Sequence, residues 1–154
     1  MSMNILVAED SDSFALLYKK SLEARGHKVT VTKNGLECFY KYSDDFKHNE
    51  GKNGKSPYDL VILDHQMPRM KGLEVAKQIL DLNPSQRILV VTEYVKAIMK
   101  GVRELGSKIE LLGKPFPSLA MVRQVEGLAT YRWRQKMSTS LKDWDGETGL
   151  SDFY

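Results

Sequence analysis

The chain alternates short apolar runs with longer amphipathic segments. Three of the runs, at 5–8, 60–63 and 88–91, are apolar without a break, which is typical of parallel strands that are buried on both faces. Residues 28–32 instead alternate between polar and apolar side chains, as a strand with one solvated face does. The predicted strands are 4–8, 28–32, 60–63, 88–91 and 109–112.

An amphipathic segment with helical spacing follows each predicted strand. Ser11 or Asp12 can cap the first helix, and Gly26 ends it. Predicted helices run from 12 to 26, from 73 to 82, from 95 to 105 and from about 118 to 137, and a further helix that bears Leu36, Phe39 and Tyr40 follows Asn34-Gly35. Residues 45–56 hold a single apolar residue, Phe46, among charged, glycine and asparagine residues, and they predict a solvated loop.

Five strand–helix units in succession predict an α/β fold with a doubly wound, five-stranded parallel sheet of the flavodoxin-like kind. Right-handed crossovers place helices on both faces of such a sheet, and they bring the carboxyl ends of all strands to one edge. Ligand chemistry is therefore expected at that edge.

Composition limits the function classes. A chain of 154 residues fits one domain with a real core. It has no apolar stretch of the ~20 residues that span a membrane and no signal-peptide pattern at its start, so a cytoplasmic protein without membrane association is expected. The single cysteine, Cys38, excludes an intrachain disulfide. A net charge of +3 is too small to indicate nucleic acid, and no direct DNA binding is expected.

Polar side chains follow four of the predicted strands. Glu9 and Asp10 follow the first, Asp64 the third, Thr92 the fourth and Lys114 the fifth. If they meet at one edge, the three carboxylates repel one another unless a cation neutralises them. Oxygen ligands of this kind suit Mg²⁺, while the lysine and the hydroxyl are placed to stabilise an oxyanion. This combination predicts phosphoryl transfer, in which an aspartate can accept the phosphoryl group.

The same residues resemble the receiver domain of response regulators in two-component signalling. The resemblance rests on Glu9-Asp10, DLVILDHQMPRMKG at 59–72, Thr92 and KPF at 114–116, and it covers about residues 4–130. Identity, order and position at successive strand ends all agree.

The resemblance implies a role for each residue of the site. Asp64 would be the phosphoacceptor, Thr92 the switch hydroxyl that moves onto the phosphoryl group, and Lys114 its ion-pair partner. Asp10 would bind Mg²⁺ directly and Glu9 largely through water, with the backbone carbonyl of Gln66 completing the protein ligands. The Lys114–Pro115 peptide would be cis, which is uncommon even before proline.

Three features depart from the usual pattern of the family, and one of them is the polar insertion at 45–56, which lengthens the connection before the third predicted strand. Leu111 stands where many members carry an aromatic residue that moves with the switch hydroxyl. Glu93 follows Thr92 where a small residue is usual, and its carboxylate could repel incoming phosphate or hold an attacking water.

We expect a receiver domain at 1–137 and an aromatic, acidic tail at 138–154 that is disordered or docks. The expected function is a stand-alone switch that takes a phosphoryl group from a sensor histidine kinase or phosphotransfer protein. It would signal to a protein target through the Tyr94 to Leu105 helix, with a homodimer possible, and it would show at most slight autophosphorylation and autodephosphorylation.

Alternatives remain open at this point. They are an unphosphorylated pseudo-receiver, a phosphorelay intermediate, a phosphatase with its nucleophile at Asp10 and a second acid at Asp12, and a flavin-binding protein. In a phosphatase, Asp64 and the KPF motif would lack a purpose. In a flavin protein, Glu9 and Asp10 would repel the cofactor phosphate.

Overall fold

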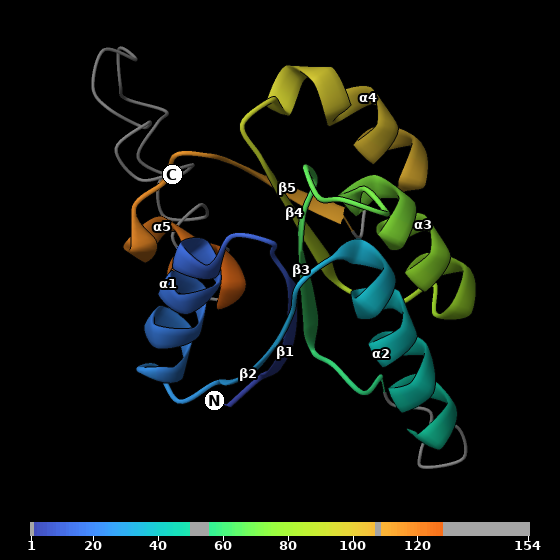
Figure 1. Cartoon of the computed structure of the whole chain (residues 1–154), viewed down its shortest axis with the longest axis horizontal. Coiled ribbons are helices and arrows are strands. Elements are labelled where there is room, and N and C mark those ends of the chain that lie inside the picture. Colours follow the sequence, from blue (N-terminus) through green and yellow to red (C-terminus); the bar gives the residue numbers. More distant parts are fainter. Residues whose placement is uncertain (1, 50–55, 107–108, 128–154) are drawn as a thin grey trace, which may run out of the picture. The chain divides into compact units, whose positions relative to one another are not determined.

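The chain folds around one parallel sheet, as the sequence predicts (Figure 1). The structure is a computed structural model that describes residues 2–49, 56–106 and 109–127. The chain divides into two compact units, Met1–Pro115 and Phe116–Tyr154. Within the described residues, the first unit contains the five-stranded sheet and four helices.

All neighbouring strands of the sheet are parallel. Its spatial order is β2-β1-β3-β4-β5. The strands are β1 (Asn4–Ala8), β2 (Lys28–Thr32), β3 (Leu60–Asp64), β4 (Ile88–Thr92) and β5 (Ile109–Gly113). In chain order, β2 lies on one side of β1 and β3 lies on the other, so the direction of strand addition reverses at β1. In such sheets, ligands bind in the crevice that this reversal creates at the carboxyl ends of the strands. The doubly wound α/β prediction is confirmed.

Burial follows the position of each strand in the sheet. Every residue of β3 and β4 is buried, as is typical of the central strands of a parallel sheet, which have a hydrogen-bonded neighbour on each side. The edge strand β2 has the burial pattern exposed, buried, half-buried, half-buried, buried. The continuous apolar runs and the alternating run of the sequence therefore correspond to central and edge positions.

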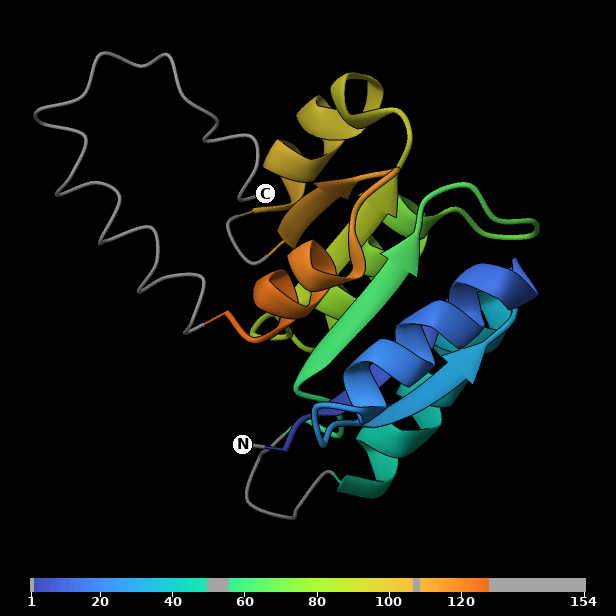
Figure 2. The same ribbon diagram turned by 90° about the vertical axis from the view of Figure 1, so that its left-hand side faces the viewer.

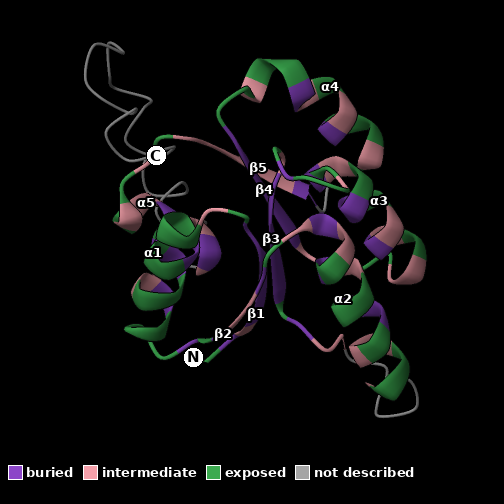
Figure 3. Ribbon diagram, in the orientation of Figure 1, coloured by how far each residue is buried: buried purple, intermediate pink, exposed green. Residues whose placement is uncertain are grey.

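Helices cover both faces of the sheet. Within the first unit, α1 (Asp12–Glu23) lies on one face, and α2 (Gly35–Asn49), α3 (Gly72–Leu82) and α4 (Val95–Leu105) lie on the other (Figures 1 and 2). Buried residues concentrate on the sheet and on the helix sides that face it (Figure 3). Among these, Cys38, Val75, Ile79 and Ile98 belong to one apolar cluster with residues of the strands.

The prediction of a loop at 45–56 is wrong in part, because α2 runs on to Asn49 and takes in residues 45–49. Phe46 follows Tyr42 by one helical turn, their rings stack with centroids 6.1 Å apart, and Phe46 packs partly buried against the core. The Tyr58 hydroxyl also donates a hydrogen bond to Asp45. These contacts hold the last turn of α2 in place despite its many charges, whereas residues 50–55 lie outside the described part.

The described part of the second unit contains α5 (Ser118–Val125), on which Met121, Val122 and Val125 are buried. The prediction of one unbroken helix from about 118 to 137 is wrong, because α5 ends at Val125 with Glu126 as its C-cap, and Gly127 follows with a positive φ. The boundary at 137 and the tail lie outside the described residues. They stay predictions. Within the described ranges, none of the helices has the length and apolar character that a membrane crossing requires.

Candidate functional site

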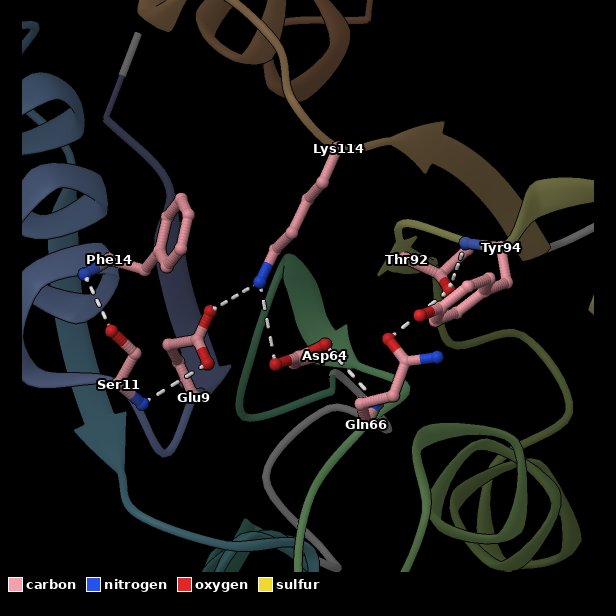
Figure 4. A network of polar contacts seen from close by, with 8 residues as sticks. All are labelled: Glu9, Ser11, Phe14, Asp64, Gln66, Thr92, Tyr94 and Lys114. Carbon is pink, nitrogen blue, oxygen red and sulfur yellow. Dashed lines mark hydrogen bonds and ion pairs between the residues drawn. The ribbon is translucent and has the colours of Figure 1, made fainter.

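The register of the sheet brings the predicted site residues together. Ala8 pairs with Leu63, so that Glu9 and Asp64 come next to each other at the ends of β1 and β3. Thr92 pairs with Gly113 at the ends of β4 and β5, and Lys114 follows at once. Figure 4 shows the resulting cluster of side chains. Residues that are far apart in the sequence thus share one edge of the sheet.

Lys114 links two of the carboxylates. Its Nζ lies 2.9 Å from Glu9 Oε1 and 3.4 Å from Asp64 Oδ2. All three side chains are at least nine-tenths buried, at 7%, 0% and 6% exposure respectively. Buried charges need partners to be tolerated, and this lysine supplies one positive charge to two negative groups.

Glu9 carries the most buried charge of the site. Burial raises the pKa of its carboxyl, the hydrogen bond to Asp64 raises it further, and Lys114 opposes both effects. The backbone N–H of Ser11 donates to Glu9 Oε2 over 3.3 Å, and Ser11 Oγ accepts from the N–H of Phe14. The residue that holds the carboxylate is therefore also the N-cap of α1, one of the two caps that the sequence offers.

Asp10 completes a group of three acids. Partial burial and then Glu9 raise the pKa of its carboxyl. One carboxylate oxygen each from Glu9, Asp10 and Asp64 lies within 4.8 Å of the other two. Such a set of hard oxygen donors is the kind that holds Mg²⁺ or a similar divalent cation.

Gln66 and Thr92 form the other side of the site. The N–H of Gln66 donates to Asp64 Oδ1 over 3.2 Å, and Thr92 Oγ1 donates to Gln66 Oε1 over a long 3.5 Å. The backbone N–H of Tyr94 donates to Thr92 Oγ1 over 3.0 Å. Since Tyr94 is the N-cap of α4, this hydrogen bond connects the Thr92 hydroxyl to the start of that helix.

Two backbone features shape the edge. At Gly72, a Cβ atom would lie 2.7 Å from the carbonyl oxygen of Asp64, so only glycine allows α3 to begin this close to the end of β3. The Lys114–Pro115 peptide is cis, as the resemblance predicts.

The sequence did not predict that an aromatic ring, that of Phe14, contacts the site. Phe14 places its ring 4.1 Å from Lys114 Nζ, measured to the ring centroid, an arrangement in which the ring attracts the ammonium (Figure 4). Phe14 lies in the first turn of α1, and 36% of its surface is exposed. Its position in the first turn after the acidic residues is the one signal that places it at this edge.

The two single-residue departures from the family pattern lie in different environments. Glu93 is exposed. Leu111 pairs with Val90 across the β4–β5 ladder and packs partly buried against the core. The position at which many members carry an aromatic residue is thus filled by an aliphatic core contact.

Comparison with known proteins agrees with this geometry. Residues 5–126 match the response regulator receiver domain. This chain belongs to the receiver family. It is 25% identical over 122 residues to the response regulator receiver protein CpdR of Brucella abortus, covering 79% of this chain and 92% of that protein. It is 28% identical over 134 residues to the polar-differentiation response regulator DivK of Brucella anthropi, covering 85% of this chain and 97% of that protein.

In some relatives the matching region is a small part of a larger protein. The hybrid signal transduction histidine kinase I of Dictyostelium discoideum is 36% identical over 104 residues, which is 65% of this chain and 6% of that kinase. The receiver is thus shared between short regulators and long kinases.

Solved structures show the same fold. The chemotaxis protein CheY4 of Vibrio cholerae superposes with a TM-score of 0.68 at 21% identity, covering 82% of this chain and 98% of that one. A CheY-like receiver domain from Methanospirillum hungatei gives a TM-score of 0.71 at 18% identity, covering 88% and 99%. Receivers are signalling switches that interact with histidine kinases or phosphotransfer proteins, and an acidic pocket for Mg²⁺ is general in the family.

Proposed function

We propose that this chain is a phosphorylation switch in which Asp64 accepts a phosphoryl group from a sensor histidine kinase or a phosphotransfer protein. One observation carries the proposal: the Lys114 ammonium lies 3.4 Å from Asp64 Oδ2, at an edge where two further carboxylates converge. A carboxylate with a fixed cation beside it and an acidic cation site around it is suited to phosphoryl transfer.

In the proposed transfer, an Asp64 carboxylate oxygen forms the new bond to phosphorus. The bond between phosphorus and the donor histidine nitrogen breaks, and its electron pair stays on the imidazole. Lys114 and, after it turns, the Thr92 hydroxyl would hold the phosphoryl oxygens, which carry the charge of the group. The chain supplies position and charge, which is most of what this chemistry requires.

The donor set fits a divalent cation of the Mg²⁺ type, because it consists of oxygens only. Asp10 and Asp64 would bind the ion directly, Glu9 through water, and the carbonyl of Gln66 would complete the set. When bound, Mg²⁺ neutralises phosphoryl charge. Glu9 keeps Lys114 in place through its 2.9 Å ion pair.

The route to a partner begins at Thr92. If its hydroxyl turns to the phosphoryl group, the N–H of Tyr94 loses the acceptor that it has at 3.0 Å. The start of α4 must then adjust. The helix from Tyr94 to Leu105 is therefore the proposed contact surface for a downstream protein, with a cytoplasmic location and no direct DNA contact. Homodimerisation remains a further prediction.

The test is incubation with acetyl phosphate and Mg²⁺, followed by intact-mass measurement of a labile phosphate adduct. We expect the adduct on the wild-type chain and on Asp81→Asn, a control on the exposed side of α3. We expect none on Asp64→Asn. A labile adduct on Asp64→Asn that maps to Asp10 would instead support the phosphatase alternative.

A second candidate function is an unphosphorylated pseudo-receiver, which Glu93 and Leu111 favour. Glu93 places an exposed carboxylate beside Thr92, and Leu111 leaves the switch without an aromatic residue. Complete absence of the adduct, with Mg²⁺ binding intact, would support this candidate. A chain that loads phosphate but shows no change in α4 would instead be a phosphorelay intermediate.

A further inference from the structure

Helix α4 carries a stripe of three positive charges, formed by Lys96, Lys100 and Arg103, and we refer to it as the basic stripe. All three residues are exposed. They follow one another at i, i+4 and i+7, which places them within an arc of roughly 60° and over a length of about 10 Å on the helix surface. The opposite side of α4 buries Ile98 and Val102 (Figure 3).

None of the three has an ion-pair partner among the described residues. Elsewhere on the first unit, exposed lysines do find acids: Lys19 pairs with Glu23 at 3.8 Å and Lys41 with Asp45 at 3.3 Å, both one helical turn apart. The Arg103 guanidinium instead lies 3.3 Å from the Met99 sulfur. The positive charges of the basic stripe are therefore exposed and available to a binding partner.

Two of the three charges, those of Lys96 and Lys100, are placed against the stability of the helix itself. Lys96 and Lys100 are like charges one turn apart, a spacing that destabilises helices. Lys96 also stands in the first turn, where the helix dipole favours negative charge, and the first turn contains no acid. A merely solvated helix face gains nothing from this placement, whereas a face that binds negative charge does.

We infer that the basic stripe of α4 binds an acidic protein segment, with carboxylates spaced to meet the three cations and an apolar side chain against Met99. The inference rests on the proposed function and deepens it, since it names the chemistry of the partner that α4 would contact. Charge complementarity is the reason that we assign an acidic segment to this surface. Three cations over about 10 Å match three acids on one face of a partner helix, whereas a nucleic acid usually needs a larger basic surface.

The test uses a helical peptide of about 18 residues, because shorter helices are marginal in water. It carries three glutamates at i, i+4 and i+7, and a companion peptide carries glutamines there. Backbone amide shifts of the ¹⁵N-labelled chain report binding and its location. We expect the acidic peptide, and not its companion, to shift residues 95–105, with affinity falling as salt is raised from about 0.1 M to about 1 M.

The variant is Lys96→Gln/Lys100→Gln/Arg103→Gln. It should bind the acidic peptide on the order of tenfold more weakly, from the loss of three exposed ion pairs. The matched control, Lys20→Gln/Lys28→Gln/Lys77→Gln, removes the same charge from exposed positions outside α4 and should bind like the wild type.

Three results would overturn the inference: no α4 shifts in the wild type, equal weakening in both triple variants, or tighter binding of a short DNA duplex through the same residues. Adduct formation with acetyl phosphate is measured on the same samples. The triple variants leave the site intact, so a wild-type chain that fails to load phosphate contradicts the proposed function alone. Normal formation of the phosphate adduct without binding of the acidic peptide contradicts only the inference about the basic stripe.

Discussion

Replacing Asp10 by asparagine should stabilise the protein when no divalent cation is present. Three carboxylates share the site, with one oxygen of each within 4.8 Å of the others. At that distance in a water-like dielectric, two unit charges repel by about 0.9 kcal/mol. The exposed Asp10 carboxylate meets two such neighbours, and Lys114 offsets roughly one of them. The net repulsion is about 1 kcal/mol, which for a chain of this size raises the melting temperature by about 3 °C.

The pH dependence follows from the raised pKa of Asp10. A carboxyl with a raised pKa contributes stability while it is protonated, below its unfolded pKa near 4, and loses that contribution as pH rises through the folded value. The advantage of Asp10→Asn should therefore be larger at neutral than at acidic pH, and it should shrink as pH falls through the raised pKa of Asp10, because the wild-type carboxyl is then protonated and neutral as well.

Thermal melts followed by circular dichroism, in EDTA and in excess MgCl₂, provide the assay. Mg²⁺ should raise the melting temperature of the wild type more than that of the variant, since binding to the folded state alone stabilises it. The matched control is Asp12→Asn. Asp12 is paired with Lys33, which lowers the pKa of Asp12, so this variant should gain nothing. An Asp10→Asn protein that melts at or below the wild-type temperature in EDTA at pH 7 would refute the reasoning.

Further outcomes are expected at other positions. Asp10→Asn should weaken Mg²⁺ binding, followed by titration, more than Glu9→Gln does, because Glu9 is assigned a water-mediated role; equal losses would contradict that division. Glu93→Ala should change the rate of adduct formation with acetyl phosphate or the rate of its decay, and unchanged rates would remove any role for this carboxylate. Phe46→Ala should cost about 1–3 kcal/mol in denaturant unfolding, whereas Tyr40→Ala, at a ring that is 60% exposed, should stay within about 0.5 kcal/mol.

Most of the fold was predictable because parallel strands at the centre of a sheet appear in the sequence as uninterrupted apolar runs. β3 and β4 read as uninterrupted apolar runs, and both are fully buried. The end of α2 was not predictable from charge alone. Its last turn holds Asp45, Lys47 and His48, which suggested a loop, but Tyr42 and Phe46 continue the buried side of the helix at a spacing of four. The spacing of two aromatic residues outweighed the polar composition around them.

The site was predictable where it depends on strand ends, and it was missed where it depends on contacts across the fold. The first polar residue after each strand falls at the same edge because the strands are parallel and in register. Phe14 meets the Lys114 ammonium from a helix near the other end of the chain, and no local pattern encodes that meeting. The side chain of Gln66 is a similar case, since the resemblance assigns a role only to its backbone carbonyl.

The hydrogen-bonding of Thr92 limits how large a signal the switch hydroxyl can send by itself. In this structure Thr92 Oγ1 accepts from the N–H of Tyr94 at 3.0 Å and reaches Gln66 only over 3.5 Å. One such bond contributes about 0.5–1.5 kcal/mol net, which changes an equilibrium by roughly 2- to 13-fold. Leu111 adds no second polar group that could change partners along with it.

A ligand shifts a conformational equilibrium only by its differential contacts with the two states. If phosphorylation changes the affinity of α4 for its partner by much more than about tenfold, further contacts are required. The exposed cations Lys96, Lys100 and Arg103 lie two, six and nine positions after Tyr94 and have no ion-pair partner among the described residues, and we expect them to supply such contacts.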